Sequence, residues 1–261
     1  MDNQYFLNNK YKSLEALKRN NISHIVSEIR NEDELKALAM SMHMQDAALL
    51  IKEYAETSVS VFNYQDLNIS SSSDIDNIHY IDNQYTRKAA EIFSSGLETA
   101  ATVYNKSYND MLYDMSEGTI SAGIVPVKDY LNGFIISFIN SIIDNDLRIV
   151  QMTQVATEEN DVWLALVSKN CFINEQNDEM SYNLIHNCYF NYNYTISDIV
   201  YSMEKVLDAK VTEIIRYEYD AERGLNILFA VDILLKNFAS VISFVRIFSE
   251  IFAIVGLYKN N

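Results

Sequence analysis

The chain contains few of the residues on which several large classes of protein depend. It has six glycines, one proline and two cysteines in 261 residues. Neither GxGxxG nor GxxxxGK[ST] occurs, which excludes classical dinucleotide binding and P-loop chemistry, because both need glycine where the backbone approaches phosphate. Cys171 and Cys188 stand too far apart for a zinc knuckle or a CxxC redox pair. We expect both thiols to be reduced.

Positive charge is also scarce. The 20 Lys and Arg against 36 Asp and Glu give a net charge of −16, a field that repels phosphate backbones and anionic lipids. Nucleic acid and membrane surfaces are therefore not expected as partners. The four histidines show no HxxxH or HExxH spacing, so no metal site is expected. The chain opens without a signal-like segment, and no apolar run reaches the roughly 18 residues that span a bilayer. These features indicate a cytoplasmic protein.

What the chain does have is apolar material, at 49% of its residues, enough for buried cores. Residues 1–70 show apolar residues at helical spacing and predict a helical segment, with Asn31 as a helix N-cap. A polar, serine-rich stretch at 68–74 predicts a linker.

From Asp76 the pattern changes to strands that alternate with helices. Strands are expected near 78–81, 99–104, 122–127, 147–153 and 162–167, and one of the helices is expected to run from Leu131 to Ile142. This alternation favours a mainly parallel sheet covered on both faces. We therefore predict a doubly wound α/β lobe over residues 76–169.

The last part of the chain, residues 179–261, shows a different order. Residues 182, 184, 186, 188 and 190 alternate as one face of a strand, and Thr195 with Asp198 forms a capping box before a helix. A hairpin with a turn at 220–224, a second helix and a final strand complete βαββαβ, the ferredoxin-like order. The fold class predicted for the whole chain is mixed, α/β and α+β, after an N-terminal helical segment.

Several segments in this order resemble prephenate dehydratases, which end in a regulatory ACT domain. They are HYIDNQYTRKAA at His79–Ala90, GIVPVKDYLNGFI at Gly123–Ile135, ILFAVDI at Ile227–Ile233 and IVGLYKN at Ile254–Asn260. The resemblance runs from about Asn77 to Tyr258. It implies a dehydratase lobe followed by an ACT-like regulatory or dimerisation domain. It also implies an activity, loss of CO₂ and water from prephenate, that needs no metal or organic cofactor.

The departures from the family pattern lie where its chemistry would be. The best counterpart of the family's catalytic Thr-Arg-Phe strand is Asp161-Val162-Trp163, so the threonine and the arginine are both missing. The family's effector turn corresponds here to Ile196–Ile199, without its glycine, so feedback by phenylalanine is not expected. The stretch from Ile78 to Ser168 is also short for two lobes, which predicts that one lobe is reduced or absent.

The candidate site residues cluster at two segments. Lys128, Asp129 and Tyr130 follow an apolar strand, where a lysine would pair a carboxylate, an aspartate would act as acid or base, and a tyrosine would donate a hydrogen bond. Alternatively, they are ordinary polar residues at a strand–helix junction, with Asp129 as a helix cap. The ligand-binding residues implied by the resemblance are Tyr85, Thr86, Pro126 and Gly133. Thr86 either cradles an anion or caps a helix.

Two functions from different classes follow. The first is a prephenate-dehydratase-like protein of aromatic amino acid metabolism with a diverged site, which converts or binds prephenate or a related small carboxylate. If active, it would be a carbon–oxygen lyase or a prephenate decarboxylase. The second is a non-catalytic protein, a pseudoenzyme that forms homodimers through its ACT-like domain and contacts a partner enzyme. A third reading takes residues 1–70 as a decayed chorismate mutase.

Overall fold

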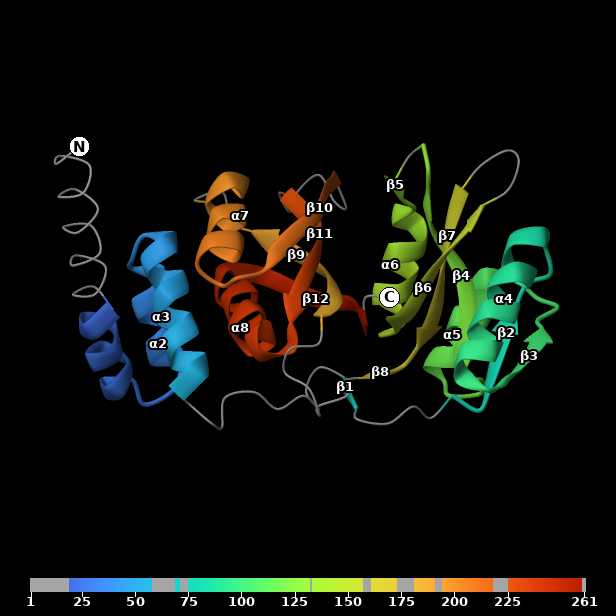
Figure 1. The fold of residues 1–261 in the computed structure, drawn as a ribbon, viewed down its shortest axis with the longest axis horizontal. Coiled ribbons are helices and arrows are strands. Elements are labelled where there is room, and N and C mark those ends of the chain that lie inside the picture. The colour runs from blue at the N-terminus through green and yellow to red at the C-terminus, as the bar shows by residue number, and fades with distance from the viewer. Residues whose placement is uncertain are drawn as a thin grey trace, which may run out of the picture.

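The computed structural model describes residues 19–57, 69–70, 75–131, 133–156, 161–172, 181–190, 194–217 and 225–259. Figure 1 shows three blocks along the longest axis: the N-terminal helices, the βαββαβ module and the α/β half. Together they confirm the predicted mixed α/β class. No helix in this described part of the chain is long and apolar enough to cross a membrane.

The N-terminal block consists of helices. Residues 19–28 are helical and are followed by α2 (Glu32–Met40) and α3 (Met44–Thr57). Asn31 caps α2 as predicted, because its side chain accepts a hydrogen bond from the backbone N–H of Glu34. The helical prediction for residues 1–70 is confirmed over these ranges, whereas Ile69–Ser70 form the short strand β1. Residues 1–18 and 58–68 lie outside the described residues.

The α/β half begins after β1. Its elements are β2 (Asn77–Tyr80), α4 (Gln84–Leu97), β3 (Ala100–Val103), α5 (Tyr108–Ser116), β4 (Ala122–Asp129), β5 (Gly133–Phe134), α6 (Ile136–Asp144), β6 (Arg148–Ala156), β7 (Asp161–Ser168) and β8 (Cys171–Phe172). The strands predicted in this region are all present. Helix α4 covers one face of the sheet, and α5 and α6 cover the other.

Two expectations for this half are wrong. The sheet is not mainly parallel, because β7 runs antiparallel to both β4 and β6. The connection from β6 to β7 is too short for a crossover helix and allows only antiparallel pairing. The helix expected from Leu131 starts instead at Ile136. A turn precedes it, made possible by the positive φ of Gly133, and β5 pairs back onto β4.

The βαββαβ order of the C-terminal part is confirmed. Its elements are β9 (Ser181–Phe190), α7 (Ile196–Lys205), β10 (Lys210–Tyr217), β11 (Leu225–Leu234), α8 (Phe238–Phe248) and β12 (Ser249–Lys259). The strands lie in the order β10-β11-β9-β12 and are antiparallel throughout, as in ferredoxin-like folds. Thr195 and Asp198 form the predicted capping box of α7. The turn predicted at 220–224 lies outside the described residues.

All these strands except β1 and β8, which pair with each other, belong to one ten-stranded sheet. The two parts of this sheet meet where β12 runs parallel to β6, with Gly256 opposite Ile149. A Cβ atom on Gly256 would lie 2.6 Å from the Cβ atom of Ile149 and 3.0 Å from its carbonyl oxygen. Glycine is therefore required at this junction, because any side chain would collide with the neighbouring strand.

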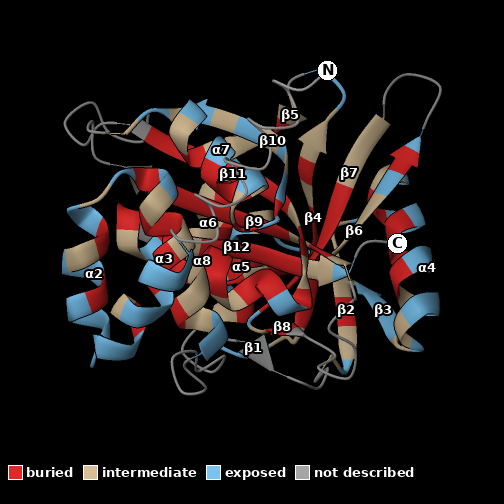
Figure 2. Cartoon of the chain, turned by 60° about the vertical axis from the view of Figure 1, so that its left-hand side comes forward, coloured by how far each residue is buried: buried red, intermediate tan, exposed pale blue. Residues whose placement is uncertain are grey.

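Apolar cores fill both faces of the C-terminal part of the sheet. On one face α7 and α8 pack on the strands, and α3 packs on these helices, so that the N-terminal block adds an outer layer. On the other face Ile185, Leu228 and Val255 pack against α5 and α6 of the α/β half. Figure 2 shows the buried strands at the centre and the exposed outer sides of α2 and α4. The division into domains at 76–169 and 179–261 remains a prediction.

Candidate functional site

A groove of about 380 Å³ lies where the end of the α/β half faces the sheet of the C-terminal part. Strands β4, β6 and β7 contribute one wall, and β9 to β12 contribute the other. Polar and aromatic residues line both walls, among them Lys128, Gln151, Trp163, Asn183, Glu213, Tyr258 and Lys259. Because its walls belong to different parts of the sheet, the groove depends on the junction at Gly256.

Lys128 projects into this groove. Its ammonium forms an ion pair with the Glu213 carboxylate on β10, and it lies 5.2 Å and 5.4 Å from the ring centroids of Phe134 and Trp163. The side chains of Lys128 and Glu213 are 24% and 26% exposed, so solvent screens this pair less than a surface ion pair. The groove thus contains a cation, a carboxylate and two aromatic rings in direct contact.

The other two members of the Lys128-Asp129-Tyr130 cluster do not join Lys128 in the groove. The Asp129 carboxylate accepts a hydrogen bond of 2.9 Å from the backbone N–H of Leu131 and so closes the hairpin turn. The alternative reading, in which Asp129 caps a helix, is wrong because α6 begins after Ile135 without a side-chain cap. Tyr130 is 70% exposed at the tip of the hairpin. The three side chains predicted to act together, as cation, as acid or base, and as hydrogen-bond donor, therefore lie apart.

Tyr85 and Thr86 lie at the start of α4, at the carboxyl end of β2. Asn83 is the N-cap of this helix, and Thr86 is its partner in a capping box. The Thr86 hydroxyl accepts from the backbone N–H of Asn83 and donates to the carbonyl of Ile81, and the side chain is buried. Both hydrogen-bonding functions of the hydroxyl are used inside the protein, which explains its burial.

The start of α5, at the end of β3, is built in the same way. Ser107 and Asp110 form a second capping box, and hydrogen bonds from Ser107 keep the pKa of the Asp110 carboxyl below its ordinary value. A permanent carboxylate at a helix N-terminus occupies the position that favours an anionic ligand. Both helix starts at this strand-end edge therefore contain their own caps.

The remaining predicted residues belong to the hairpin region. Pro126 pairs with Leu164 just before a register shift in the β4–β7 ladder, where a residue without an N–H is tolerated. Gly133 faces β10: a Cβ atom at this position would lie 3.4 Å from Oε1 of Glu213. Of all the residues predicted from sequence as site members, Lys128 alone lines the groove.

A row of polar residues on β9 to β12 was not predicted from the sequence. Lys210, Asp232, Asn183 and Tyr258 stand opposite one another on neighbouring strands. The Asn183 amide donates to Oδ1 of Asp232 at 3.0 Å. Strand alternation was the available signal, because the opposite face of β9 was identified as the apolar one. The residues of β4 and β6 that face this row are determined by how the two parts of the sheet pack, which strand alternation does not indicate.

His186 lies on that apolar face of β9. It is fully buried and stacks on Phe229 at a centroid distance of 5.3 Å. Burial lowers its pKa to about 3, so the imidazole is neutral at physiological pH. Burial likewise raises the pKa of the Cys171 thiol to about 12, which leaves this cysteine protonated and unreactive.

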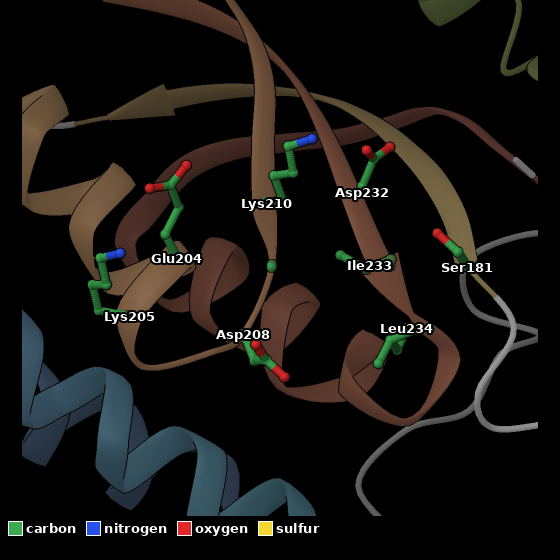
Figure 3. A pocket seen from close by; sticks show the side chains of 9 residues that line it. Ser181, Glu204, Lys205, Asp208, Lys210, Asp232, Ile233 and Leu234 are labelled. Carbon is green, nitrogen blue, oxygen red and sulfur yellow. The ribbon is translucent and has the colours of Figure 1, made fainter.

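A second hollow, of about 400 Å³, lies at the end of α7 and the start of β10. Figure 3 shows that Glu204 and Lys205 reach it from α7, whereas Lys210 and Asp232 come from adjacent strands. The Asp208 carboxylate nearby accepts a hydrogen bond from the Asn237 amide at 3.4 Å. No group of three His, Cys, Asp or Glu side chains among the described residues could hold a metal ion. This hollow is a mixed-charge surface.

Comparisons with known proteins agree with this architecture. No protein-family model and no curated protein matches the chain. Among solved structures, a prephenate dehydratase from Streptococcus mutans matches at a TM-score of 0.52 and 10% identity, over 70% of this chain and 97% of that one. A prephenate dehydratase from Arthrobacter aurescens, in complex with L-Phe, matches at 0.55 and 9% identity, over 70% and 90%.

A structure described as GqqA, a novel type of quorum quenching acylase, also matches, with a TM-score of 0.51 and 10% identity over 71% of this chain and 95% of that one. Proteins described by different activities thus share this fold, so the fold alone does not determine the chemistry. On these comparisons, the chain has the fold of the prephenate dehydratases.

Proposed function

We propose that this chain binds a small aromatic acid, prephenate or a related compound, in the groove and does not convert it. The observation that carries the proposal is the position of Lys128. It supplies a cation between aromatic walls, which is suited to the carboxylate and ring of such an acid. Its predicted catalytic neighbours Asp129 and Tyr130 lie in a turn and in solvent.

The lack of turnover follows from chemistry at two further positions. Departure of hydroxide from prephenate needs a proton donor, and departure of CO₂ is favoured by a fixed cation for the carboxylate. The counterparts of the family's threonine and arginine are Asp161 and Val162. The Asp161 carboxylate accepts a hydrogen bond of 2.8 Å from the Gln154 amide. An aspartate in place of the threonine and a valine in place of the arginine supply no cation for the carboxylate of the acid.

Titration calorimetry with prephenate and phenylpyruvate tests the binding, and absorbance of the aromatic keto acid tests the turnover. We expect measurable affinity for at least one acid, no product, and a loss of affinity of about tenfold or more in Lys128→Gln. Lys205→Gln, which alters the second hollow, serves as the matched control and should bind normally. Formation of phenylpyruvate from prephenate would show an enzyme, and absence of binding by either acid would exclude the proposal.

A second function, self-association near strand β10 of the ACT-like part, is favoured by exposed apolar side chains on both sides of this edge of the sheet. Leu131 is 76% exposed beside Tyr130, and Ile214 is 37% exposed on β10, the outermost strand of the sheet. The hairpin adjoins this strand, since Gly133 approaches both Glu213 and Ile215. Exposed apolar side chains beside a sheet edge are typical of protein contacts. We propose a homodimer formed at β10.

Light scattering over a range of protein concentrations tests this second function. We expect a dimer that Leu131→Asp converts to a monomer. Ile92→Asp, which places the same charge at a half-exposed position of α4, should leave the dimer intact. A wild-type protein that stays monomeric would exclude the homodimer. A partner enzyme would then be the proposed occupant of this surface.

A further inference from the structure

The Asn183 side chain has an orientation that its surroundings determine. A carboxylate only accepts hydrogen bonds, so the atom that contacts Oδ1 of Asp232 at 3.0 Å is the amide nitrogen. Asn183 lines the groove, whereas Asp232 does not. The amide oxygen of Asn183 is buried and has no hydrogen-bond partner within the described part of the chain. It is therefore an acceptor whose hydrogen bond is still unmade.

Gln151 provides a second acceptor of this kind. It lines the same groove from β6, and its amide oxygen is also buried without a donor among the described residues. The last torsion of an amide side chain has a broad preference, so a small rotation turns its oxygen toward the groove. A donor placed in the groove would complete these hydrogen bonds, and a ligand without a donor leaves them unmade.

The charged residues of the groove determine how many carboxylates it accommodates. In the described part of the chain they are Lys128, Glu213 and Lys259. Lys128 pairs with Glu213, whereas Lys259, at the end of β12, is exposed and forms no ion pair with a described carboxylate. The groove thus has an excess of one positive charge. One carboxylate neutralises this excess, a dicarboxylate leaves a negative charge, and a ligand ammonium would add a third cation.

We infer that the acid bound in the groove is a phenolic monocarboxylic acid, with one carboxylate and a hydroxyl group on its aromatic ring. This ligand class rests on the proposed function, of which it names the acid. The carboxylate meets Lys128, and the charge of Lys259 offsets the charge then left on Glu213. The ring packs on the wall that contains Trp163, and its hydroxyl donates a hydrogen bond to one of the two amide oxygens.

A phenolic monoacid differs from the compounds that the sequence resemblance implies. Prephenate is a dicarboxylate, and phenylpyruvate, which forms from it by loss of CO₂ and water, has no ring hydroxyl. A site that hydrogen-bonds a ligand hydroxyl discriminates strongly against the analogue without it, because the polar groups of the site are then left unpaired. The amide oxygens of Asn183 and Gln151 therefore assign a specificity that the family pattern does not predict.

Three acids that differ only at the para position of the ring test the hydroxyl. Calorimetry compares 4-hydroxyphenylpyruvate with phenylpyruvate, which lacks the hydroxyl, and with 4-methoxyphenylpyruvate, whose ring oxygen cannot donate. We expect 4-hydroxyphenylpyruvate to bind about tenfold more tightly than either analogue, and more tightly than prephenate. Equal affinity for the three pyruvates, or tighter binding of prephenate, would overturn the inference and leave the proposed function intact. Failure of all four acids to bind would overturn the proposed function itself.

Variants at the two acceptors locate the hydroxyl. Gln151→Met and Asn183→Leu each remove an amide oxygen with little change in volume. At least one of them should abolish the preference for 4-hydroxyphenylpyruvate while phenylpyruvate binds as before. Gln154→Met, the same substitution on the same strand, is the matched control and should keep the preference, because the oxygen of Gln154 is not one of the buried unpaired acceptors. A preference that survives in both acceptor variants would overturn the inference.

The contribution of the second cation is measured at Lys259. Lys259→Gln should weaken 4-hydroxyphenylpyruvate and phenylpyruvate by the same factor, about two- to fivefold, because the charge of an exposed lysine is screened by solvent. Lys205→Gln removes the same charge from the second hollow and should change neither affinity. Unchanged or tighter binding of both acids in Lys259→Gln would overturn the inference.

Discussion

Two polar regions of this molecule use similar residue types in opposite ways. At the strand-end edge of the α/β half, Asn83, Thr86, Ser107 and Asp110 satisfy the starts of α4 and α5 with hydrogen bonds inside each turn. In the groove, the amide oxygen of Asn183 has no donor from the described residues. Open α/β sheets usually bind ligands at the carboxyl ends of their strands. Here the capping groups at that edge are already hydrogen-bonded within the protein.

The difference shows that fold topology and free polar groups are separate guides to a site. A capping box satisfies its donors and acceptors within four residues, so it has no need of a ligand. The groove is formed by strands distant in sequence. Some of its buried polar atoms have no hydrogen-bond partner among the described residues. We therefore place binding in the groove, and the following predictions test this contrast.

The largest effect is expected at the junction that forms the groove. Gly256→Ala should reduce the free energy of unfolding by about 2 to 3 kcal/mol, because the new Cβ atom would collide with Ile149 in a packed sheet. Urea denaturation measures the loss. Gly96→Ala in α4 is the control: its Cβ atom meets nothing within 4 Å, and a gain of roughly 0.5 to 1 kcal/mol is expected.

If Gly256→Ala were as stable as the wild type, β12 and β6 would not be in close contact and the groove would lose one of its walls. The strand-end edge would be unaffected by this change, because its hydrogen bonds are local. Loss of ligand affinity in Gly256→Ala at temperatures where it remains folded would support the position of the site in the groove.

The second effect concerns the other face of β9, where His186 is buried. In the folded protein His186 stays unprotonated down to about pH 3, whereas in the unfolded chain it binds a proton below about pH 6.5. The free energy of unfolding therefore falls as the pH falls from 6.5 toward about 3. The expected slope is about 1.4 kcal/mol per pH unit. His186→Phe should remove this slope in denaturation experiments between pH 6.5 and 4.5. His43→Gln, at an exposed position, should retain it.

The third effect compares an ion pair in the groove with one near the edge. Lys128→Met should cost about 1 to 2 kcal/mol, because Glu213 is left partly buried without its partner. Lys128→Met combined with Glu213→Met should recover much of this loss. Arg87→Met removes the exposed pair with Asp82 at the start of α4, and should cost much less than Lys128→Met, because solvent screens this pair. Equal losses of stability in Lys128→Met and Arg87→Met would contradict the contrast between the groove and the strand-end edge.

The features that the sequence predicted well are local. The caps at Asn31 and Thr195 depend on neighbouring residues, and the βαββαβ order depends on apolar periodicity within each element. Strand direction was predicted wrongly for β7, since it depends on which strands meet in space. Asn183 could be placed on the polar face of β9 by alternation. Its partner Asp232 is 49 residues away, and periodicity does not indicate such a contact.

The smallest effect bears most directly on the strand-end edge. Thr86→Val removes the capping hydroxyl and should lower the free energy of unfolding by about 1 kcal/mol, whereas Thr86→Ser should keep most of the stability. Because this hydroxyl already bonds to Asn83 and Ile81, we expect unchanged affinity for the groove ligand in calorimetry. The sequence-based prediction that Thr86 binds ligand requires the opposite, a loss of affinity beyond the loss of stability. A folded Thr86→Val protein with weakened binding would place the site at the strand-end edge.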